Sequence, residues 1–134
     1  MAGGIRDSDT ETPYESLGGA HGVQMLVKRF YEIMDHQSQF SEIRALHGAD
    51  LSRPRQDLFE FLSGWLGGPP LYFEKGARRC IMSAHSAISI GATEVTQWVK
   101  CMEAALSETH ITQDLRERII DALSRFAGNM RNKT

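Results

Sequence analysis

The chain has 134 residues, of which 41% are hydrophobic and 24% are charged, and its formal net charge is −2. This length predicts one domain with its own core, and the nearly balanced charge argues against nucleic acid or an anionic membrane as a partner. The chain contains no apolar run long enough to span a membrane, no secretory signal pattern and no Cys-x-x-Cys pair, so a cytoplasmic protein is expected.

The first residues are rich in polar and small side chains. They predict a disordered lead over residues 1–12, followed by a single domain over residues 13–134. Thr12 and Pro13 are typical of a short capped helical turn, which the Gly18-Gly19 pair ends.

A helix is predicted from His21 to Met34, because apolar residues recur there at steps of three and four. Tyr31 lies on the apolar face, so its hydroxyl needs a core acceptor or points into a site. The connector over residues 35–50 predicts a short helix over residues 41–46. It also carries His47, which composition alone would place at the surface.

The next predicted helix runs from Arg53 to Leu66 and ends at Gly67-Gly68-Pro69-Pro70. Its inward residues are Leu58, Phe61, Leu62 and Trp65. Residues 71–76 are predicted to form a loop. The basic pair Arg78-Arg79 follows, and it is either solvated surface or a clamp for a carboxylate.

His85 stands in an apolar stretch over residues 80–91, with no charged neighbour close by. A neutral imidazole in such a wall suits an axial haem ligand. The other interpretation is a hydrogen-bonded core histidine, which is the commoner case for a lone histidine. Cys80 and Cys101 form no haem-attachment motif and are expected to be buried free thiols, so any haem would be held non-covalently.

Two long helices complete the chain. The first is predicted to begin after Gly91 with Thr93 as its N-cap, and the second runs from about Thr112 to Met130. Their inward residues are Val95, Trp98, Val99, Met102, Ala105 and Leu106, then Leu115, Ile119, Ile120, Leu123, Phe126 and Met130. No alternating strand pattern occurs, so the fold class is all-α.

Several of these motifs together resemble those of group II truncated haemoglobins, over nearly all of residues 12–130. The matching residues are Tyr14-x-x-Leu17-Gly18-Gly19, Phe30-Tyr31, the run from Phe61 to Tyr72 through Gly67-Gly68-Pro69, and His85 with Trp98 thirteen residues later. The resemblance implies a truncated globin, a two-over-two α-helical sandwich around a non-covalent haem b.

The resemblance also implies roles for individual residues. His85 would be the proximal iron ligand, while Tyr31, Trp98 and His47 would form a polar distal pocket; the match of His47 requires a short insertion around residues 37–41. Residues expected to bind the cofactor are His85, Leu58, Phe61, Tyr72, Arg79, Met82, Ile88 and Ile90. Family members usually have a basic residue just before the proximal histidine and an aromatic residue after it, where this chain has Ala84 and Ile88. Several residues are therefore candidates to bind the haem propionates. They are Arg79, Arg78, Lys75, Tyr72, Arg53 and Arg55.

The function implied is reversible binding of dioxygen, nitric oxide and carbon monoxide. Two uses share the same residues. The protein would hold or sense oxygen in the first, and in the second it would detoxify nitric oxide or peroxides. Only the second use would make the protein an enzyme and call for a reductase. A further hypothesis is that Tyr31 or His47 binds the iron directly in the resting state, when no ligand is present. A monomer and a homodimer both fit the sequence. The alternative of another class is a cofactor-free helical interaction module.

Overall fold

In a computed structural model of the chain, the structure describes residues 11–74 and 90–131. These residues form helices and helical turns, with no strand among them, which confirms the all-α prediction. The elements are α1 (Pro13–Ser16), α2 (Gly19–His36), the 3₁₀ turn η1 (Ser38–Phe40), α3 (Ser41–Ala45), α4 (Ser52–Trp65), α5 (Leu71–Glu74), α7 (Ala92–Leu106) and α8 (Gln113–Gly128). Within this described part, no helix is long and apolar enough to cross a membrane.

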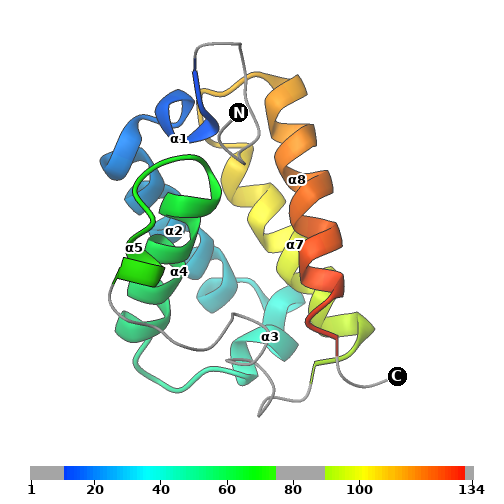
Figure 1. Cartoon of the computed structure of the whole chain (residues 1–134). Helices are drawn as coiled ribbons and strands as arrows, with labels where there is room; N and C mark the ends of the chain where they lie inside the picture. The colour runs from blue at the N-terminus through cyan, green and yellow to red at the C-terminus, as the bar shows by residue number, and fades with distance from the viewer. Residues whose placement is uncertain (1–10, 75–89, 132–134) are drawn as a thin grey trace.

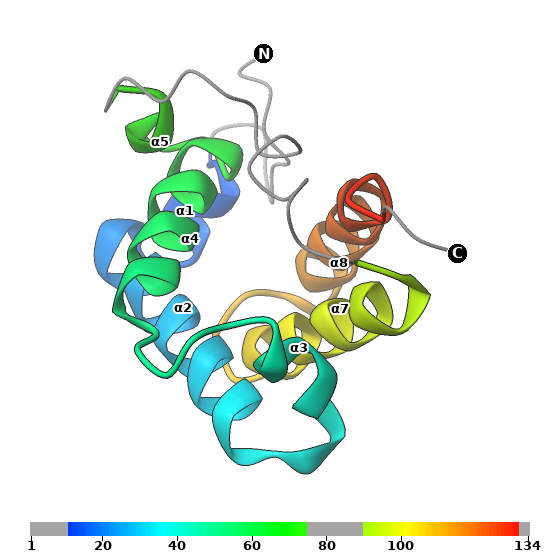
Figure 2. The ribbon, with the colours of Figure 1, turned by 90° about the horizontal axis from the view of Figure 1, so that it is seen from below.

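The four long helices form two pairs. α2 packs against α4, α7 packs against α8, and the contact between α2 and α7 joins the pairs. Figure 1 shows α7 and α8 side by side along one flank, and the view from below in Figure 2 shows α3 lying across the end of α2 and α7. This arrangement confirms the predicted two-over-two sandwich.

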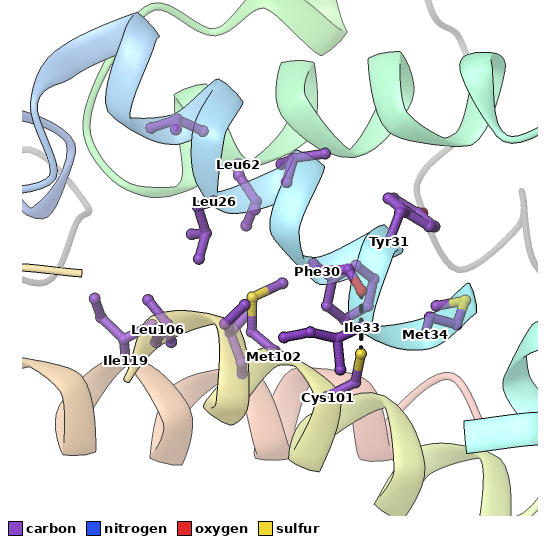
Figure 3. Packing of buried hydrophobic residues seen from close by; sticks show 14 of the residues in the cluster. Leu26, Phe30, Tyr31, Ile33, Met34, Leu62, Cys101, Met102, Leu106 and Ile119 are labelled. Carbon is purple, nitrogen blue, oxygen red and sulfur yellow. Dashed lines mark hydrogen bonds between the residues drawn. The ribbon is translucent and has the colours of Figure 1, made fainter. Parts of the chain in front are cut away.

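The core lies where α2 meets α7 and α8. The predicted apolar face of α2 is buried there, and Phe30 has no exposed surface. Figure 3 shows Leu26, Phe30 and Ile33 of α2 facing Met102 and Leu106 of α7, with Ile119 of α8 beside them. Each such side chain contributes about 1.5–3 kcal/mol when it leaves water, so this face largely fixes how the pairs meet.

The N-terminal turn α1 is fastened to the end of α4. Thr12 and Glu15 form the reciprocal capping box, with N–H···O distances of 3.0 and 3.1 Å. The Tyr14 amide donates to the Leu66 carbonyl at 3.0 Å, and the Tyr14 ring lies directly over Gly68. Two motifs of the sequence, Tyr14-x-x-Leu17 and Gly67-Gly68, are therefore in contact.

Two local predictions were wrong. Leu71–Glu74 is a helix, α5, where a loop was expected. The two prolines before it have φ angles fixed near the helical value, so the chain can begin a helix immediately after them. The N-cap of α7 is Gly91 and not Thr93. Glu94 explains the difference, since its carboxylate accepts from the Gly91 amide at 2.8 Å and so starts the helix two residues earlier.

Candidate functional site

A cavity of about 340 Å³ lies between α2, α4, α7 and α8, with α3 and the residues after it at one end. Its walls are mostly apolar, and polar side chains occupy a minority of the lining. The lining residues are Tyr31, Ile43, Leu46, His47, Pro54, Asp57, Leu58, Phe61, Tyr72, Ile90, Glu94, Val95, Trp98, Phe126, Ala127 and Met130. The three predicted distal residues and four of the predicted cofactor-binding residues are thus brought to one cavity.

Tyr31 is the most buried polar group of the cavity wall, with 6% of its surface exposed. Its hydroxyl has a long hydrogen bond of 3.5 Å to the Pro54 carbonyl in the first turns of α4. Burial, with smaller contributions from Asp57 and Cys101, raises the pKa of Tyr31 far above its usual value. The phenol therefore keeps its proton at neutral pH, and this proton is a hydrogen-bond donor at the cavity wall.

Trp98 reaches the same cavity from α7. Its ring meets the edge of the Phe30 ring at 5.5 Å between centroids, and Phe30 meets Tyr31 in the same manner at 4.9 Å. Such edge contacts fix ring orientation as well as burying apolar surface. The indole N–H can only donate, so Tyr31 and Trp98 bring two donors to the site from two helices.

His47 lies after α3, beside Tyr31, with 5.7 Å between the ring centroids. Its Nδ1 is 2.8 Å from the Ile43 carbonyl oxygen. A carbonyl oxygen can only accept, so Nδ1 carries the proton, and in the neutral ring Nε2 is then an acceptor.

The remaining wall is aromatic and aliphatic. Phe61 of α4 stacks on Phe126 of α8 at 5.3 Å and meets the edge of Tyr72 at 6.1 Å. Leu58 and Ile90 complete this part of the lining.

The other predicted site residues are placed as follows. His85, Arg79, Met82 and Ile88 lie outside the described residues, as do Lys75 and Arg78. Arg53 and Arg55 are exposed and neither lines the cavity. Arg53 instead pairs with Asp57 at 3.2 Å.

Two charged lining residues were missed from the sequence, although their spacing could have found them. Asp57 precedes Phe61 by four positions, which places it on the same face of α4. Glu94 precedes Trp98 by four positions on α7 in the same way. A charged residue at such a position is easily assigned to the surface, because charged residues are seldom buried.

The cavity fits a largely apolar group that also meets hydrogen-bonding side chains. The lining supplies apolar contact from α4, α7 and α8, and its polar side chains include the buried Tyr31, Trp98 and His47. Helix pairs stacked two over two around such a cavity are the arrangement that the resemblance to truncated globins implies.

Comparison with known proteins agrees with this class. The bacterial-like globin family matches residues 12–132. The group II 2-on-2 haemoglobin of Agrobacterium tumefaciens is 38% identical, with 96% of this chain and 99% of that chain covered and a TM-score of 0.88. A cold-adapted truncated haemoglobin of the Antarctic bacterium Pseudoalteromonas haloplanktis TAC125 is 35% identical, with 92% and 100% covered and a TM-score of 0.88. The group 2 truncated haemoglobin YjbI of Bacillus subtilis is 28% identical over 123 residues, 91% of this chain and 89% of that protein.

The chain belongs to the bacterial-like globin family, and within it to the group II truncated haemoglobins. It is a haem protein with haem b as its cofactor, and it binds dioxygen and related diatomic ligands.

Proposed function

We propose that this haemoglobin retains its ligand through two fixed donors, the Tyr31 hydroxyl and the Trp98 indole N–H. Bound haem supplies the iron at which a diatomic ligand is held. The observation that carries the proposal is the protonated, buried Tyr31 hydroxyl in the cavity wall, whose bond to Pro54 is only a long one. A ligand atom with partial negative charge would be a better acceptor for this proton than the distant carbonyl.

The position of both donors in a largely apolar wall makes each hydrogen bond stronger than it would be in water. Neither donor needs to reorganise, because Phe30 packs against both rings. We infer slow release of the ligand. Slow release suits a sensor, a scavenger, or a catalyst of nitric oxide or peroxide chemistry better than an oxygen transporter.

The apolar contacts to the macrocycle are assigned to Leu58, Phe61, Tyr72 and Ile90, all of which line the cavity. For the other face, the family resemblance supports His85 as the iron ligand. Met82 and Ile88 would pack beside it, and Arg79 would meet a propionate.

The variant Tyr31→Phe tests the proposal, because it removes the hydroxyl and keeps the ring. If this donor contributes about 1–3 kcal/mol, the rate constant for dioxygen dissociation should rise roughly five- to a hundredfold. Stopped-flow measurement on the haem-loaded ferrous protein gives this rate constant.

Tyr14→Phe is the matched control, since Tyr14 lies against Gly68 and does not line the cavity. It should leave the rate constant within about twofold of the wild type, because it removes no donor from the pocket. An unchanged rate constant in Tyr31→Phe would contradict the donor role.

A further inference from the structure

The charged side chains that line the cavity are acidic. They are Asp57 of α4 and Glu94 of α7, and no lysine or arginine lines the cavity within the described ranges 11–74 and 90–131. The Glu94 carboxylate accepts from the Gly91 amide at the start of α7. Asp57 belongs instead to an ion pair with Arg53, one helical turn earlier on α4.

The pair of Arg53 and Asp57 has its negative end toward the cavity. The Nε of Arg53 lies 3.2 and 3.3 Å from the two carboxylate oxygens of Asp57. The Asp57 side chain lines the cavity and is 47% exposed, whereas Arg53 is 85% exposed and does not line it. Water screens the guanidinium more than the carboxylate, so the pair leaves a negative potential on the cavity side.

The charge of Asp57 reaches the Tyr31 hydroxyl. Burial is the main cause of the raised pKa of Tyr31, and the carboxylate of Asp57 is the second cause. The hydroxyl also approaches the carbonyl of Pro54, which lies three positions before Asp57 on the same helix. A ligand held by Tyr31 would therefore lie within the field of this carboxylate.

We propose that Asp57 is a specificity-determining residue of the ligand pocket, where its carboxylate disfavours anionic ligands relative to neutral ones. An anion between apolar walls meets a repulsion that water screens only in part, while a neutral ligand meets almost none. Dioxygen, nitric oxide, carbon monoxide and hydrogen peroxide are neutral, whereas nitrite and azide are anions. The inference rests on the proposed function, in that it takes this cavity as the ligand pocket.

Sodium azide is the probe for an anionic ligand. Titration of the haem-loaded ferric protein at low ionic strength, followed by its Soret absorbance, gives the azide dissociation constant. Asp57→Asn keeps the shape of the side chain and removes its charge, so this constant should fall roughly three- to tenfold. Carbon monoxide binding to the ferrous protein is the neutral reference, and the change is expressed as the ratio of the two affinities.

Arg53→Gln separates the effect of charge from that of structure. Arg53→Gln and Asp57→Asn break the same ion pair, so a purely structural role of the pair would change the azide dissociation constant in the same direction. If charge acts, Arg53→Gln leaves the carboxylate of Asp57 without its compensating cation. The azide dissociation constant should then rise, which is the opposite of the change in Asp57→Asn.

Asp114→Asn is the matched control for the loss of one negative charge. Asp114 pairs with Arg118 at 3.1 Å, with the same spacing of four residues, on α8, and it does not line the cavity. The azide dissociation constant should stay within about twofold of the wild type, because the charge removed lies outside the pocket and is screened by salt and water.

The infrared stretching band of bound carbon monoxide gives a second readout, which does not depend on affinity. A negative charge near the ligand oxygen hinders the movement of electron density from iron into the ligand, and so raises the stretching frequency. Asp57→Asn should therefore lower this frequency, and Arg53→Gln should raise it.

Three results would each overturn the proposal. They are an unchanged azide dissociation constant in Asp57→Asn, changes in the same direction in Asp57→Asn and Arg53→Gln, and a change in Asp114→Asn as large as that in Asp57→Asn. Tyr31→Phe tests the donor role through dioxygen dissociation, so failure of the proposed function is distinguishable from failure of this inference.

Discussion

Cys101 lies at the contact between α2 and α7, with no exposed surface. Its thiol donates to the Phe30 carbonyl at 3.3 Å, as Figure 3 shows. Burial raises the pKa of Cys101 to about 12. The thiol is therefore an inert part of the core at neutral pH, which agrees with the expected buried free cysteine.

This burial makes the free energy of unfolding depend on alkaline pH. An unfolded thiol ionises near pH ~8.5, while the folded thiol holds its proton until about pH 12. The folded state binds the proton more tightly, so stability is complete below pH ~8.5 and falls as the pH rises, by at most about 1.4 kcal/mol per pH unit. Urea unfolding of the carbon-monoxide-loaded protein between neutral pH and pH ~10 should show this decline.

Cys101→Ala should flatten that decline, and Cys80→Ala, which changes the other cysteine, is the matched control. A slope that is the same in Cys101→Ala and in the wild type would show that the thiol does not titrate on unfolding.

At the residue scale, Tyr31, Trp98 and His47 were predicted through the family motif to share one pocket, and all three line one cavity. Their hydrogen bonds do not follow from the sequence. The contact of the His47 ring with the Ile43 carbonyl, for example, depends on the backbone geometry of α3 and the residues after it.

At the scale of elements, α1 packs closely against the turn after α4. A Cβ atom built on Gly68 would lie 2.5 Å from the Tyr14 ring, and one on Gly67, where φ is +100°, would lie 2.9 Å from Thr12. A contact of this length cannot persist, so a side chain at either position forces α1 away from the turn.

Gly68→Ala should therefore lower the free energy of unfolding by about 1–3 kcal/mol. Urea unfolding measures the change. Gly48→Ala is the control, because a Cβ atom there meets nothing within 4 Å. If the Tyr14 ring is the obstacle, Gly68→Ala should cost less in a Tyr14→Ala background, and equal costs in both backgrounds would rule out this contact.

The long helices were predictable because their apolar periods are unbroken. α2, α4 and α8 begin and end within about two residues of the predicted limits, which is the usual uncertainty of helix ends. The start of α7 and the short helix α5 were mispredicted. Both depend on local capping around Gly91 and the proline pair, and the periodicity of apolar residues does not report on capping.

At the scale of the whole molecule, the cavity separates the two helix pairs over part of their length. α2 and α7 pack directly, whereas the Phe61–Phe126 stack links α4 and α8 across the cavity lining. A bound macrocycle would add apolar contacts to both sides, so the cofactor completes the core. The two-over-two arrangement itself was predicted from the family resemblance, since helical periods alone do not specify which helices pair.

Removing haem should therefore lower the urea midpoint of unfolding. A ligand that binds only the folded state adds about 2.7–4.1 kcal/mol when its free concentration exceeds its dissociation constant by a hundred- to a thousandfold. Circular dichroism of the haem-free and the reconstituted protein compares the midpoints. Equal midpoints would mean that the cofactor makes no net contribution to the folded core.

Phe30 limits which substitutions the pocket can accept. One fully buried ring supports both Tyr31 and Trp98, so a substitution at Phe30 disturbs both donors at once. Substitutions at residues with a shared partner are not additive in their effects. The three positions therefore form one coupled unit, in which a substitution at one residue alters the packing of the other two.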